Sequence, residues 1–161
     1  MTLTGSNVLV IRNGKLDMNG KTLTTASGAS ATIIFAGGSG GGSTSFSHIP
    51  TGGGTINISS PTSGTWSGVA IYQDPTLTSG VNISDAGNSP SWNISGLVYL
   101  PHSSVTFSGV VGKATTGQAC FVIVVDNITI NGTGSIAQNS TGCASQGLSM
   151  PASIGHPKLV A

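Results

Sequence analysis

Ser95–Gly109 reads SGLVYLPHSSVTFSG: an apolar strand closed by Pro101, followed by a second strand in which apolar and polar residues alternate. Two other stretches have the same order: SGVAIYQDP (Ser67–Pro75) before VNIS at Val81, and ACFVIVVD (Ala119–Asp126) before ITING at Ile128. The second strands begin at Val81, Val105 and Ile128, at intervals of 24 and 23 residues. We therefore interpret the sequence as an internal repeat of short strands.

This repeat decides the predicted fold class. Units of two or three strands recurring every 23–27 residues are typical of a β-solenoid, in which stacked coils share a core that no single coil can bury. The 161 residues would supply about six coils. Parallel crossovers are right-handed. The prediction is an all-β fold, a right-handed parallel β-helix of about six short coils. A β-sandwich with Gly/Ser turns is the alternative.

The composition agrees with an all-β chain and excludes several classes of function. Glycine occupies 25 positions, charged residues make up 6% and the net charge is +1. Long helices are excluded because good helix formers are scarce. Binding to a phosphate backbone is excluded because five cations are too few. Hydrophobic residues reach 37% and mean hydropathy is +0.25, which excludes disorder for most of the chain.

The organisation along the chain predicts one β-solenoid domain over residues 1–161, with a flexible Gly/Ser loop at 37–47. No stretch reaches the roughly 18 apolar residues of a membrane span. The N-terminus has no signal-peptide pattern, although the composition is typical of an extracytoplasmic protein. We therefore expect a domain excised from a longer secreted or membrane-anchored protein. Pro151–Ala161 is predicted to cap the last coil.

Cys120 and Cys143 are separated by 23 residues, the length of one coil. They would lie above one another on neighbouring coils, where strands are ~4.8 Å apart. That spacing is within reach of a disulfide. The sequence therefore predicts a Cys120–Cys143 disulfide, with two free buried thiols as the alternative.

Three stretches together resemble a bacterial family: Pro61–Pro75, Trp92–Gly109 and Ala119–Ile136. Their order and spacing are similar to those in the C-terminal domains of TadG-like proteins, described as putative Flp pilus-assembly TadE/G-like. The resemblance implies a Tad/Flp pilus-associated envelope protein in the periplasm or at the surface of a Gram-negative bacterium. It also implies a membrane anchor outside this chain and partners among pilus-assembly or cell-envelope proteins. It supplies no catalytic residues.

A candidate ligand face comes from aromatic residues that recur with the repeat. Trp66 and Trp92 begin successive units, and Tyr72 and Tyr99 follow them. Aromatic side chains exposed along one face bind sugars, whereas packing in the core or at corners is the alternative. Asp74 and Asp126 each follow a long apolar strand, so they are expected along one edge of that face.

The catalytic inventory is small. Clustered carboxylates would serve a glycan hydrolase or lyase, and the candidates are Asp74, Asp85 and Asp126. The histidines show no metal-ligand spacing. His102 with Ser103 or Ser104 and an aspartate is a conceivable triad, but such neighbours are expected by chance in a chain so rich in serine.

The expected function is therefore a non-catalytic structural or protein-interaction module without cofactor or metal. The first alternative is a carbohydrate-binding or adhesin module that uses surface glycan as its ligand. The second is a carboxylate-dependent glycan-degrading enzyme.

Overall fold

The computed structural model describes residues 1–37, 54–75, 77, 83–85, 91–108, 120–131 and 142–149. These residues contain no helix. Their nine strands are β1 (Thr2–Leu3), β2 (Ser6–Arg12), β3 (Thr22–Thr25), β4 (Ser30–Ala36), β5 (Thr55–Ser59), β6 (Val69–Gln73), β7 (Ile83–Asp85), β8 (Ser91–Ser108) and β9 (Phe121–Asn131).

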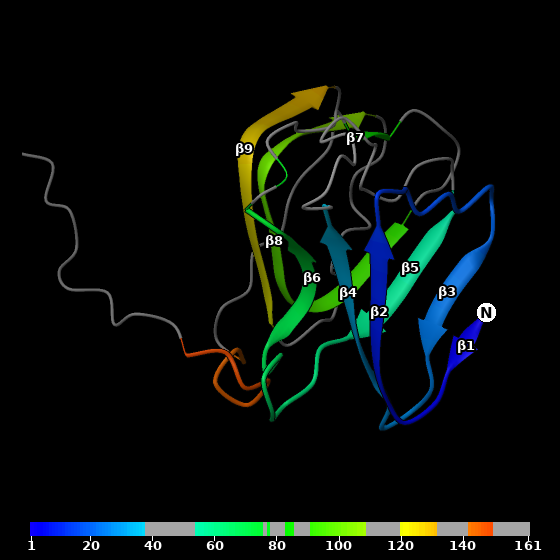
Figure 1. Cartoon of the computed structure of the whole chain (residues 1–161), viewed down its shortest axis with the longest axis vertical. Helices are drawn as coiled ribbons and strands as arrows, with labels where there is room; N and C mark the ends of the chain where they lie inside the picture. Colours follow the sequence, from blue (N-terminus) through cyan, green and yellow to red (C-terminus); the bar gives the residue numbers. More distant parts are fainter. Residues whose placement is uncertain are drawn as a thin grey trace, which may run out of the picture.

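All the strand pairs in the described residues are parallel. One series of neighbours is β1-β3-β5-β8, and the other is β2-β4-β6-β8 with β9 beyond β8. In Figure 1, β2, β4 and β6 form one wall and β1, β3 and β5 another, while β8 curves from the second wall to the first. The result is an all-β, β-solenoid-like parallel sheet. Parallel pairing throughout argues against the sandwich alternative, which requires antiparallel neighbours.

β8 joins the two walls by bending at Gly96. Ser91–Ser95 pair with β5, whereas Leu97–Tyr99 pair with β6. Gly96 has φ +126°, and a Cβ there would lie 2.6 Å from the Ser60 Oγ. Only glycine fits this bend, because it has no Cβ to meet the neighbouring chain.

The core lies between the walls and is made of aliphatic and aromatic side chains from every level of the stack. Its largest fully buried members are Phe35, Phe121, Ile33, Ile56, Ile58, Ile71, Leu77, Ile94 and Leu100. β-branched residues dominate this set, as expected for strands packed on a shared interior. Each level therefore depends on its neighbours for burial.

The apolar strands were predicted close to their observed positions, but several segments differ, among them β1 and Ser91–Ser95 of β8, which were not predicted. The apolar residues of Lys15–Met18 also favour a strand by sequence, but this segment forms a single bridge at Asp17. Asn13 and Asn19, which flank it, have left-handed backbone (φ 51° and 41°), and these turns interrupt the extended chain on either side. Thr22–Thr25 was not predicted, since Leu23 is its one apolar residue, yet it is strand β3.

The register of the repeat is confirmed at one step and wrong at another. Val105 pairs with Ile128, as the interval of 23 residues predicts. Val105 pairs on its other side with Ile83 rather than Val81. The predicted loop at 37–47, apart from Gly37, and the predicted cap Pro151–Ala161 lie outside the described residues.

Candidate functional site

Five neighbouring strands carry one continuous row of apolar and aromatic side chains on the outer face of the wall. The row, which we call the outer row, consists of Val10 (β2), Ile34 (β4), Tyr72 (β6), Tyr99 (β8) and Val124 (β9), paired in register. The residues directly before them in the first four strands are Leu9, Ile33, Ile71 and Val98, which pack in the core. Because successive side chains of a strand point to opposite faces, the row points outward.

The aromatic side chains of the outer row pack against one another. The Tyr72 and Tyr99 ring centroids are 5.6 Å apart with planes at 16°, and Trp66 lies 5.2 Å from Tyr72 at 56°. Burial raises the pKa of Tyr72, and Asp74 and Tyr99 raise it further, so the phenol stays neutral. Stacked tyrosines each have one face against the other. This arrangement favours packing over the free ring face that sugar stacking requires.

The structure brings three of the four predicted aromatic residues together. Trp66 lies in the turn before β6 and reaches Tyr72, which stacks on Tyr99. Trp92 belongs to the part of β8 that pairs with β5, on the other wall, and its side chain lies outside the described part of the structure. All three grouped side chains are half-buried. The glycan-binding alternative stays a prediction.

The predicted carboxylates do not form a cluster in the described residues. Asp74 is half-buried and Asp126 is exposed. They follow Tyr72 and Val124 by two residues, with β8 between their strands, which corresponds to about 10 Å. The side chain of Asp85 lies outside the described part. No group of three or more His, Cys, Asp or Glu that could hold a metal occurs among the described residues.

A buried polar corner contains Ser103, one of the two serines considered for the triad. The Gln73 side chain is fully buried, and its Oε1 accepts hydrogen bonds from the His102 backbone N–H (3.3 Å) and the Ser103 hydroxyl (3.1 Å). His102 is exposed whereas Ser103 is fully buried, so the imidazole and this hydroxyl face opposite ways. Ser103 therefore serves the corner structurally and is not paired with His102 as a nucleophile.

The Cys120–Cys143 disulfide is confirmed. Cys143 lies in a turn and not in a strand stacked on β9, so the geometric reason given from the sequence is wrong. The bond instead ties the segment 142–149 to the wall. Cys120, Val122 and Cys143 form a small second core, against which Leu97 and Leu148 pack. The disulfide indicates an oxidising, extracytoplasmic environment.

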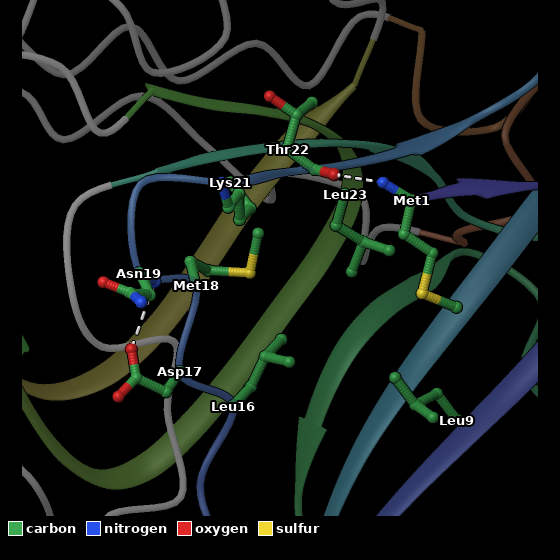
Figure 2. A pocket seen from close by; sticks show the side chains of 9 residues that line it. All are labelled: Met1, Leu9, Leu16, Asp17, Met18, Asn19, Lys21, Thr22 and Leu23. Carbon is green, nitrogen blue, oxygen red and sulfur yellow. Dashed lines mark hydrogen bonds between the residues drawn. The ribbon is translucent and has the colours of Figure 1, made fainter.

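An open pocket of about 480 Å³ lies at the opposite end of the stack, beside β1 and β2. Figure 2 shows Met1, Leu9, Leu16, Met18 and Leu23 around it. The Met1 ammonium donates to the Thr22 carbonyl (2.7 Å), and the Asn19 N–H donates to the Asp17 carboxylate (3.1 Å). The pocket is therefore an apolar hollow with a polar rim.

Sequence reasoning expected open strand edges at the two ends of the stack, but it did not identify the residues that make them apolar surfaces. The exposed large hydrophobic residues in the described part of the chain are Met1, Val8, Val10, Val124 and Ile128. Met1 directly precedes β1, Val8 and Val10 lie in β2, and Val124 and Ile128 lie in β9. A signal was present, since Val8–Ile11 is apolar at four successive positions and an edge strand with one buried face should alternate.

Comparison of the chain with family models, curated proteins and solved structures finds no match. In the part of the chain that the structure describes, no helix is long and apolar enough to cross a membrane.

Proposed function

We propose that this chain is a non-catalytic, extracytoplasmic solenoid module that acts through contacts with other proteins. The observation that carries the proposal is the distribution of exposed hydrophobic side chains, which lie at the two ends of the stack, whereas Tyr72 and Tyr99 in the middle of the outer row stack on each other. Exposed apolar surface concentrated in this way is typical of protein contacts.

The cellular setting of the proposal comes from the resemblance to TadG-like C-terminal domains. In this setting the module belongs to a pilus-associated envelope protein, in the periplasm or at the cell surface, and binds pilus-assembly or envelope proteins. The disulfide supports an oxidising compartment. The proposal takes the stacked strands to be a right-handed β-helix of about six coils.

The test is genetic and structural. The gene is deleted in the organism that encodes this chain, and surface pili are counted by electron microscopy beside an adherence assay. Wild-type protein should restore both. Complementation with Val10→Lys, which alters an exposed side chain at one end, should restore protein level without restoring pili. The matched control Val69→Thr, at a half-buried position within the same wall, should restore both.

Two results would contradict the proposal. Normal piliation and adherence in the deletion strain would separate the chain from pilus assembly. Turnover of a polysaccharide by the purified protein, abolished by Asp126→Asn, would move the function to glycan degradation.

A further inference from the structure

The two outer edges of the parallel sheet are both apolar. Within the described residues β2 pairs only with β4, and the first half of β9 pairs only with β8, so each has one edge without a strand neighbour. Val10 is 56% exposed and Val124 40%, whereas Ile34, inside the same row, is 9% exposed. The two valines are more exposed than Ile34 because they lie at the ends of the row, where no further strand covers them, and not because of their residue type.

The side chains of the two edges match in register if β9 of one molecule is placed beside β2 of another. The outer row begins at Val10 and ends at Val124, so a β9 placed beside the free edge of β2 continues the row with Val124 next to Val10. The inner row would continue in the same way. It runs Leu9, Ile33, Ile71, Val98 and Ile123 in register. Ile123 of the added strand would then lie next to Leu9, which lines the open pocket.

Charge favours the same register. Arg12 follows Val10 by two residues and Asp126 follows Val124 by two residues, so the continued row places the guanidinium beside the carboxylate. Both side chains are exposed, and neither makes an ion pair within the described residues. Lys15 and Lys21 also lie at the β2 end, where Asp17 pairs with Lys15 (3.4 Å) and offsets one of the two, so this end keeps an excess of positive charge. Two β2 ends would repel one another, whereas a β2 end and a β9 end attract.

We propose that a second copy of this chain is the occupant of the β2 edge, adding its β9 in parallel so that the molecules associate head to tail. The contact is heterologous, which means that it repeats from copy to copy and builds a linear assembly. This inference rests on the proposed function, since it specifies which protein contact the terminal strands make.

The test is sedimentation velocity of the purified protein from micromolar to millimolar concentration. The wild-type sedimentation coefficient should rise with concentration. Arg12→Asp alone and Asp126→Arg alone should each lower the association constant at least about fivefold, because attraction becomes repulsion. The control Ser63→Asp/Thr65→Asp, at exposed positions of the turn before β6 and outside β2 and β9, matches the charge change of Arg12→Asp and should associate like wild type.

Mixing the two single variants gives the decisive measurement. Arg12→Asp keeps a native β9 end and Asp126→Arg keeps a native β2 end, so an equimolar mixture should recover association that neither variant shows alone. Circular dichroism verifies that each variant is folded. A second readout mixes Val10→Cys with Val124→Cys under oxidation and expects a cross-linked dimer. Within one molecule these positions are four strand spacings apart, about 19 Å, too far for a disulfide.

A wild-type protein that stays monomeric to millimolar concentration would overturn the inference, as would a mixture that associates no better than its components. Association that survives both charge reversals would place the contact elsewhere. Monomeric protein together with lost pili in the deletion strain would overturn the inference alone. Self-association together with normal pili would overturn the proposed cellular function alone.

Discussion

The two ends of the stack differ in how their outermost strands are covered and held. At the β9 end, a disulfide and the packed turn 142–149 cover part of the outer face. At the β2 end, Leu9 remains partly buried, the 480 Å³ pocket is open and no covalent bond holds the first strands. The comparison teaches that burial in this fold is set by the number of neighbouring levels and that a covalent tie can substitute for a missing neighbour.

The largest expected effect compares two positions of the same inner row. Ile33 is fully buried and pairs in register with Leu9, which is partly buried at the open end. Ile33→Ala should lower the free energy of unfolding by about 4 kcal/mol, whereas Leu9→Ala should lower it by about 1 kcal/mol, because less packing is lost at the edge. Urea unfolding followed by circular dichroism measures both. Equal losses would show that the β2 end is packed as tightly as the interior.

The second effect concerns the tied end. Replacing both cysteines, Cys120→Ala/Cys143→Ala, should lower the free energy of unfolding by about 3 kcal/mol, since the bond closes a loop of roughly 23 residues in the unfolded chain. Thermal unfolding of the variant and of wild type measures the loss, with and without reductant. Reductant should shift wild type toward the variant and leave the variant unchanged; a shift in the variant would trace the effect to some other cause.

The smallest effect compares two glycines with the same backbone conformation. Gly68 has φ +77° and a Cβ there would lie 2.6–2.9 Å from Leu148, whereas Gly28 has φ +73° and open space around it. Gly28→Ala should cost about 1 kcal/mol of backbone strain alone. Gly68→Ala should cost about 2 kcal/mol, since it also displaces the segment 142–149. Chemical denaturation compares them, and identical costs would mean that this segment contributes no packing.

The sequence predicted the all-β class and the stacked apolar strands because each depends on local pattern or on a spacing of one repeat. The disulfide was predicted from the same spacing, although Cys143 lies in a turn. Val105 opposite Ile128 is the clearest case. Strand β3 could not be predicted, because Thr22–Thr25 is made a strand by its neighbours β1 and β5 and not by its own apolar residues. The interval from Ile34 to Tyr72, 38 residues, hid the repeat where the Gly/Ser-rich segment is inserted.

The candidate site was predicted only in part for a similar reason. The aromatic residues could be found because they recur with the repeat, and Trp66, Tyr72 and Tyr99 do lie together. Their exposure could not be predicted, because it depends on whether each ring stacks on the next strand's ring or points to solvent. The ends of the stack have no repeat signature at all. They are defined by which strands lack a neighbour, a property of the assembled sheet.

The disulfide also determines how the chain would respond to tension. A pull on the two ends of the protein can unravel strands on either side of the bond, but the stretch from Cys120 to Cys143 stays closed. At ~3.5 Å per residue, that stretch hides about 80 Å of contour length. Under oxidising conditions the molecule is therefore shorter at full extension and stiffer near its C-terminal side. Reducing the disulfide would therefore increase the length of the chain at full extension, without changing the residues that contact other proteins.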